Sequence, residues 1–131
     1  LVEYNLADYD NFFFAIRILC NRIMNSGAST VYLKFHPYQN ENVKRDVMSC
    51  LQTQNIHNCV LSSDEPFEQI LLSSEKLNLY GFESSLLFYA TVFRRNHKVY
   101  SANRLLSQKD KNYNMHIQKI DYTLFKDFIQ L

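Results

Sequence analysis

The sequence predicts an α/β fold, a Rossmann-like parallel sheet with helices on both faces. Short runs of β-branched and aromatic residues alternate with longer stretches whose apolar residues recur at helical spacing, and the connections between them are short. The chain has 131 residues, of which 47% are hydrophobic and 21% charged, so it can bury the core of one domain. In such sheets ligands bind beyond the carboxyl ends of the strands, and we expect the functional residues there.

The first helix is predicted over residues 8–24. Asp8 or Asp10 can cap it, and its apolar residues fall on one face. Gly27 ends it, because glycine readily adopts the backbone conformation that follows a helix. The three consecutive phenylalanines at 12–14 are expected to be core, or a surface that docks on a further domain.

The later elements follow the same alternation. Four short apolar runs are predicted as strands, at residues 30–35, 59–61, 77–80 and 98–101. Helices are predicted at residues 40–51, 67–72, 86–93 and 122–129, and a polar loop at residues 108–114. Pro37 ends the first strand, because proline has no N–H to donate to a neighbouring strand.

Charge and glycine content exclude several functions. Fourteen Lys and Arg against 13 Asp and Glu give a net charge of +1, which argues against a nucleic-acid partner. With only two glycines the chain holds neither a GxGxxG nor a Walker A phosphate loop. Any phosphate site must therefore use helix N-termini, hydroxyl groups and side-chain donors.

The cysteines and the chain's opening residues bear on its location. Three cysteines without a CxxC pair indicate free, buried thiols in a reducing compartment, and scattered histidines give no metal site. No run approaches the ~20 apolar residues of a membrane span, and there is no signal-peptide pattern. We expect a cytoplasmic protein. Because the chain opens on Leu1, we also expect it to be a fragment of a longer one.

Two serines follow the third predicted strand. Ser84 and Ser85 open a helix, where their hydroxyls join free backbone N–H groups and the positive end of the helix dipole. Together these groups can hold a phosphate without a glycine-rich loop. The alternative is plain helix capping, for which serine is a favoured residue.

The ends of the first two strands carry further candidates. His36 can donate to a phosphate oxygen or neutralise charge on a leaving group, or it can be bonded to nearby backbone. Pro66 begins a short helix whose first turn holds Glu68, which complements the helix dipole or accepts from ribose hydroxyls. Arg94 and Arg95 follow a helix end, where cations favour the dipole; substrate contact is the alternative.

These residues resemble a known family. Lys34-Phe35-His36-Pro37 resembles the His-Pro motif of bacterial sialyltransferases with two Rossmann-like domains, the GT-B architecture. The run Gly81-Phe82-Glu83-Ser84-Ser85 resembles their serine motif, and the short helix with Pro66 and Glu68 is similar to their nucleotide-binding domain. The resemblance is closest to the lipooligosaccharide sialyltransferase and polysialyltransferase group and covers residues 30–93.

The resemblance implies an inverting transfer of sialic acid from CMP-sialic acid to a bacterial surface glycan, without a metal or other cofactor. His36 would contact the CMP phosphate and assist its departure, and Ser84 and Ser85 would bind that phosphate. Pro66 and Glu68 would hold the cytidine. The protein would act in the cytoplasm, with peripheral association at the inner face of the bacterial membrane.

One feature of the family is absent. Its catalytic base lies in an acidic Asp/Glu-Asp/Glu-Gly motif of the N-terminal domain, whereas the acid pair Asp64-Glu65 is followed here by Pro66. We therefore expect residues 1–131 to form a single donor-binding domain that needs an N-terminal partner domain and is inactive alone.

Two alternatives remain open. Glycerophosphotransferases of wall-polymer synthesis resemble the same two motifs and use a CDP-linked donor. The chain could also be a noncatalytic α/β interaction domain, in which His36, Ser84 and Ser85 are structural and no cytidine nucleotide binds.

Overall fold

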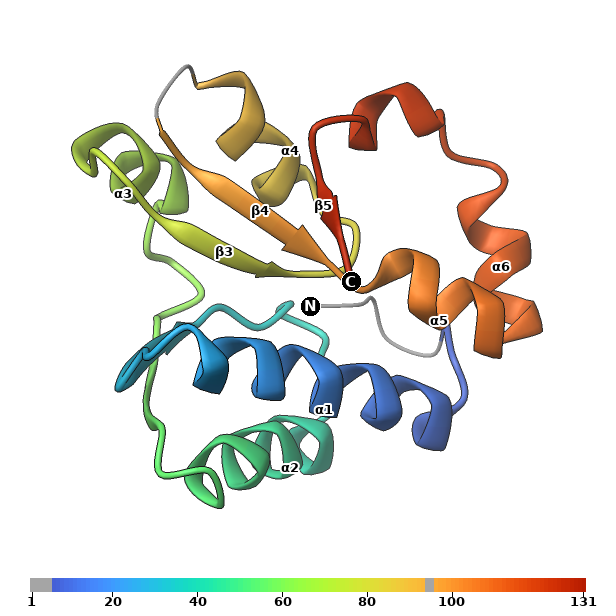
Figure 1. The fold of residues 1–131 in the computed structure, drawn as a ribbon, viewed down its shortest axis with the longest axis horizontal. Helices are drawn as coiled ribbons and strands as arrows, with labels where there is room; N and C mark the ends of the chain where they lie inside the picture. Colours follow the sequence, from blue (N-terminus) through green and yellow to red (C-terminus); the bar gives the residue numbers. More distant parts are fainter. Residues whose placement is uncertain (1–5, 94–95) are drawn as a thin grey trace.

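The computed structural model describes residues 6–93 and 96–131 (Figure 1). Within them strands and helices alternate, as the sequence predicts. The elements are α1 (Tyr9–Asn25), β1 (Thr30–Leu33), α2 (Glu41–Gln52), β2 (His57–Val60), α3 (Phe67–Ser73), β3 (Asn78–Gly81), α4 (Ser85–Val92), β4 (Lys98–Ser101), α5 (Asn103–Lys109), α6 (Lys111–Ile117), the 3-10 helix η1 (Tyr122–Phe125) and β5 (Ile129–Gln130).

The strands pair in parallel, in two groups. β1 pairs with β2, so that Thr30 lies opposite His57 and Leu33 opposite Val60. β3 pairs with β4, and β4 with β5. This arrangement confirms the prediction of a Rossmann-like α/β fold with parallel strands.

The first helix forms as its sequence predicts. The Asp8 carboxylate accepts from the Asp10 backbone N–H at 3.0 Å and caps α1. Gly27 follows the helix end with φ of +78°, a conformation that costs glycine little. Phe12 and Phe13 are buried, so this part of the aromatic run is core; Phe14 is half-buried, with the Lys109 ammonium 4.0 Å from its ring centre.

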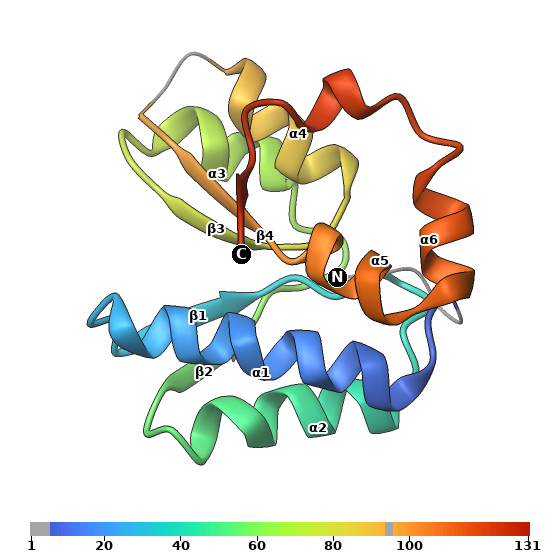
Figure 2. The ribbon, with the colours of Figure 1, turned by 45° about the vertical axis from the view of Figure 1, so that its right-hand side comes forward.

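Helices cover both faces of the β3–β4 pair. Leu79 and Val99 point into a core that includes Leu87 of α4. The next residue of each strand points the other way, because side chains alternate along a strand. Tyr80 packs into the core built around α1 and α2, and the Arg22 guanidinium of α1 lies 5.1 Å from the Tyr100 ring centre. In Figures 1 and 2, α1 and α2 accordingly lie together, away from α3 and α4.

Residues 108–114 do not form the predicted loop. They lie in α5 and α6, which meet at Asp110. The Asp110 carboxylate accepts from the backbone N–H groups of Tyr113 at 2.9 Å and Asp8 at 2.7 Å, so it caps α6 and ties it to the start of α1. Polar composition was misleading here, because Asp110 is buried as a cap.

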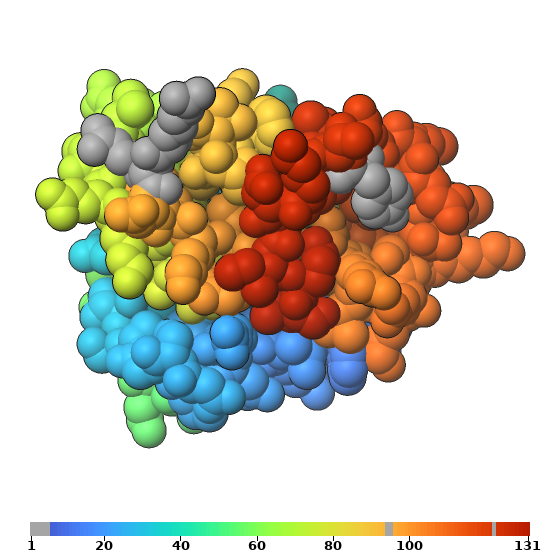
Figure 3. All heavy atoms as spheres, turned by 45° about the horizontal axis from the view of Figure 1, so that its top comes forward, coloured from blue at the N-terminus to red at the C-terminus, as the bar shows by residue number. Residues whose placement is uncertain are grey.

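The predicted helix at residues 122–129 is also wrong. The structure has the single turn of η1, capped by the Asp121 carboxylate, and then the short strand β5. Ile129 pairs with Tyr100 of β4, so contact with the sheet overrides the local helical pattern. Figure 3 shows this C-terminal segment, in red, on the molecular surface.

Among the described residues, no helix is both long and apolar enough to cross a membrane.

Candidate functional site

The five candidate residues all follow the carboxyl ends of strands. His36 follows β1, Pro66 and Glu68 follow β2, and Ser84 and Ser85 follow β3. In Figure 2, β1 and β3 run in the same direction, from left to right. The loops after these strands therefore lie at the same edge of the fold, where ligands of open parallel sheets bind.

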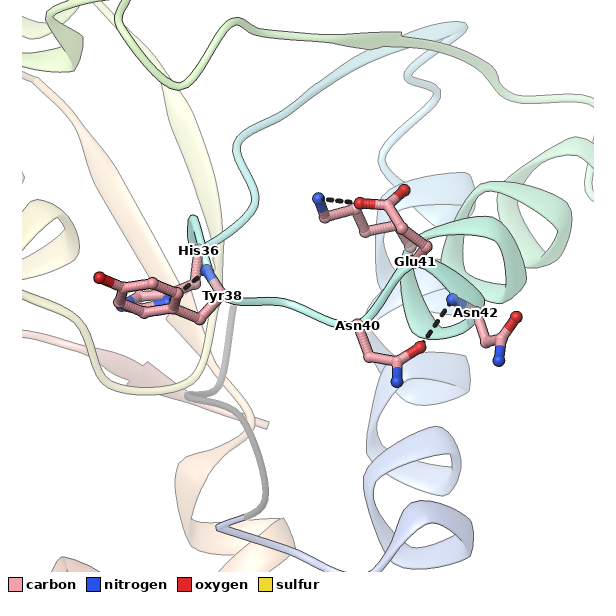
Figure 4. Close-up of polar contacts among 6 residues, drawn as sticks. His36, Tyr38, Asn40, Glu41 and Asn42 are labelled. Carbon is pink, nitrogen blue, oxygen red and sulfur yellow. Dashed lines mark hydrogen bonds and ion pairs between the residues drawn. The ribbon is translucent and has the colours of Figure 1, made fainter.

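The backbone of its own loop orients His36. Its Nδ1 atom accepts a hydrogen bond from the Tyr38 backbone N–H at 3.2 Å, and the two rings lie 5.6 Å apart (Figure 4). Because Nδ1 is the acceptor, the neutral ring carries its proton on Nε2. The half-buried imidazole therefore has Nε2–H available as a donor to a ligand oxygen.

Ser84 is the N-cap of α4. Its backbone is extended, and its Oγ accepts from the Leu87 backbone N–H at 3.2 Å. Capping uses one lone pair of the hydroxyl and leaves its hydrogen outside that bond. Ser85 is the first residue of the helix and is exposed. The capping alternative is thus true of Ser84, and it is compatible with phosphate binding.

Pro66 and Glu68 lie at the start of α3. Pro66 occupies the N-cap position without a side-chain capping bond, and Glu68 is in the first turn. Both residues are exposed. Their position fits either complementarity to the helix dipole or contact with a ligand at the strand end.

Lys34 orders the loop between β2 and α3, a role that the sequence analysis missed. Its Nζ atom donates to the backbone oxygens of Ser62, Ser63 and Glu65, at 2.5, 2.9 and 3.0 Å. One ammonium therefore links the strand that carries His36 to the loop that leads into Pro66. The sequence signal was a lysine two residues before the histidine, at the end of an apolar strand.

Ser101 orders the loop that carries the two serines, and it too was missed. Its fully buried Oγ donates to the Phe82 carbonyl at 2.7 Å and accepts from the Asn103 N–H at 3.2 Å. Phe82 is also held by ring contacts with Phe12 of α1 and Tyr113 of α6. The sequence shows a serine at the end of β4, but it does not indicate that this serine bonds to the Phe82 carbonyl, 19 residues earlier in the chain.

Glu83 places a carboxylate in the same loop, directly before Ser84. Its carboxylate lies 3.8 Å from Nε2 of His116 on α6, and its side chain is 9% exposed. This pair was not predicted, because residues 111–114 of α6 were expected to be loop and no helix was predicted around His116.

A cavity of about 630 Å³ lies between the two strand groups. All four residues of β1 and all four of β3 line it, together with apolar side chains of α1, α3 and α4. At the carboxyl ends of the strands it reaches Lys34 and Ser84. Of the five candidate residues, Ser84 is the one that lines this cavity.

The structure brings the candidates to one edge without joining them directly. Within the described part of the chain, no hydrogen bond or ion pair links His36 to Ser84 or Ser85. Nor do three His, Cys, Asp or Glu side chains group there as a metal site. Arg94 and Arg95 lie outside the described residues.

Comparison with known families identifies the chain. Residues 1–103 match the model of the alpha-2,8-polysialyltransferase (POLYST) family. The chain belongs to this family. All of the candidate residues lie within the matched region, and the family is one of sialyltransferases, as the two motifs predict. No curated protein and no solved structure matches the chain significantly.

Proposed function

We propose that this chain is the donor-binding part of an inverting GT-B sialyltransferase that uses CMP-sialic acid. One observation carries the proposal: in a polysialyltransferase family member, the His-Pro loop and the Ser-Ser helix start follow parallel strands at one edge of the fold. The acceptor is a bacterial surface glycan, and the family name, alpha-2,8-polysialyltransferase, supports a chain of sialic acid residues as that glycan.

Each candidate residue has a role that its geometry supports. His36 donates from Nε2 to a phosphate oxygen of CMP and stabilises the charge that develops as the glycosidic bond breaks. Ser84 and Ser85 donate their hydroxyl hydrogens, and the first turn of α4 adds backbone N–H groups. Pro66 and Glu68, on the loop held by Lys34, contact the cytidine.

The remaining elements of the proposal follow from this assignment. At the phosphate, the His36 imidazole and the dipole of α4 supply the electrostatic stabilisation that a divalent metal would otherwise provide. The base that activates the acceptor hydroxyl comes from an N-terminal domain, so this chain binds nucleotide without turning it over. It works in the cytoplasm, at the inner face of the bacterial membrane, and has no nucleic-acid partner.

A calorimetric titration with CMP, UMP and CDP tests this proposal. We expect saturable binding of CMP in preference to UMP, lost in His36→Ala and in the double variant Ser84→Ala/Ser85→Ala. The matched controls are His57→Ala and Ser49→Ala, which alter exposed residues of β2 and α2 and are expected to keep CMP affinity. A preference for CDP would favour the glycerophosphotransferase instead. If a longer form with its N-terminal domain also fails to bind, the interaction domain is the better reading.

A further inference from the structure

Residues 36–39 form a tight turn beyond the carboxyl end of β1. The Gln39 backbone N–H donates to the His36 carbonyl at 2.9 Å, which closes a four-residue β-turn. Pro37 holds the second position of this turn, where its fixed φ is favoured, and Tyr38 holds the third. The turn therefore has a defined conformation, with Tyr38 at its tip.

The residues on both sides of this tip are anchored. Phe35 is buried in the core that includes α1, and the Gln39 side chain is buried as well. Asn40 follows and caps α2 by accepting from the Asn42 backbone N–H at 2.8 Å (Figure 4). A side chain carried by such a preorganised turn costs little conformational entropy to order when a ligand binds.

Tyr38 presents an open aromatic ring at the tip of the turn. It is 78% exposed, more than any other large apolar or aromatic side chain among the described residues. Within that part of the chain, its ring neighbour is His36, with 5.6 Å between the ring centres and 45° between the ring planes. Figure 4 shows both side chains on the same side of the turn. An accessible ring beside the candidate phosphate donor offers a surface on which a flat ligand group can stack.

The position of β1 in the fold indicates which ligand group this is. β1 pairs with β2 on one side and, with β3, lines the cavity on the other. Lys34 bonds three carbonyls of the loop after β2, so that loop lies close to the turn that carries Tyr38. Under the proposed function, the phosphate binds at His36 and the start of α4, and the cytidine contacts the loop after β2. A nucleotide that joins these two places passes the turn after β1.

We propose that the Tyr38 ring stacks against the cytosine ring of the donor nucleotide. This inference rests on the proposed function and adds a residue to its base-binding part. Stacking uses the flat face that every base has, whereas selection among bases uses hydrogen bonds to the base edge. Tyr38 therefore contributes affinity for the nucleotide but not the preference for CMP over UMP. That preference comes from the loop that carries Pro66 and Glu68.

Titrations of the wild-type protein and of Tyr38→Ala with CMP, UMP and ribose 5-phosphate test this inference. Removal of one stacked ring is expected to weaken CMP and UMP binding by the same factor, at least about 5-fold. Ribose 5-phosphate has no base, so its affinity should stay unchanged and show that the phosphate site is intact. Tyr38→Phe keeps the ring and should retain wild-type affinity for all three ligands. Tyr32→Ala is the matched control, because it removes another exposed tyrosine, from β1 itself, and should change none of them.

The NMR spectrum of CMP gives a direct readout of stacking. Protons over the face of an aromatic ring resonate upfield, so the cytosine ring-proton signals should move upfield on binding to the wild type and not on binding to Tyr38→Ala. Equal losses of CMP and ribose 5-phosphate affinity in Tyr38→Ala would overturn the inference, because Tyr38 would then act through His36. Unchanged CMP affinity in this variant would overturn it too, and a loss seen only with a sialic acid oligosaccharide would assign the ring to the glycan instead. Absence of CMP binding by the wild type, in either form titrated above, would refute the proposed function and this inference with it.

Discussion

Replacing Ser101 with alanine tests how the serine loop is held. The Ser101 hydroxyl is fully buried and makes two hydrogen bonds, to the Phe82 carbonyl and from the Asn103 N–H. Ser101→Ala leaves both backbone groups without this partner in a dry site. Leaving a buried polar group unsatisfied costs about 1–3 kcal/mol, and for this pair we expect a loss of about 2 kcal/mol in the free energy of unfolding.

Urea denaturation followed by circular dichroism measures this loss. The midpoint is expected to fall without a change in slope, because the variant alters stability and not the surface exposed on unfolding. Ser107→Ala is the matched control. Its hydroxyl also bonds a backbone carbonyl, that of Arg104, but on a partly exposed helix, so we expect a change below about 0.5 kcal/mol.

A loss in Ser101→Ala no larger than in Ser107→Ala would refute the reasoning, since the two hydrogen bonds would then contribute nothing net. A second effect of Ser101→Ala is expected on nucleotide binding under the proposed function. Because Phe82 lies two residues before Ser84, the same variant is expected to weaken CMP binding under conditions where it remains folded.

Three further predictions concern other contacts. Lys34→Met removes the donor to three backbone carbonyls of an exposed loop, so it should speed amide exchange at residues 62–65 and weaken CMP binding. Lys44→Met, the control, should do neither. In Gly81→Ala the new Cβ would lie 2.9 Å from the Leu87 side chain, so thermal denaturation should show a loss of about 1 kcal/mol. Burial and Cys50 raise the pKa of the Cys20 thiol above its ordinary value of 9.0. Iodoacetamide labelling at pH 8, followed by mass spectrometry, should therefore modify Cys59 before the buried Cys20. The free energy of unfolding should also fall above about pH 9, because there the Cys20 thiol loses its proton in the unfolded chain but keeps it in the folded one.

The fold class could be predicted because it depends on features of the local sequence. The first helix carries a long apolar stripe, an acidic cap and a terminating glycine, and its boundaries agree with the prediction within one residue. The short strands were placed correctly in order but shifted by up to two residues, because an apolar run does not show where pairing begins.

The errors occurred where distant contacts decide the structure. Asp110 resembles a loop residue in the sequence, but it caps one helix and binds the start of another. β5 forms because Ile129 pairs with Tyr100 of β4. The apolar residues around Ile129 recur at helical spacing, so the sequence did not indicate this pairing. Lys34 and Ser101 were missed for the same reason, since each acts on backbone atoms of a different loop.

The positions of His36 and Ser84 were predicted, yet their spacing depends on what lies between β1 and β3. Among the described residues these two strands form no hydrogen bonds with each other, and a cavity of about 630 Å³ is lined by both of them. Under the proposed function, the phosphate of the nucleotide would bridge the two loops with donors on both sides, because His36 and Ser84 each bond to backbone of their own loop or helix and not to each other.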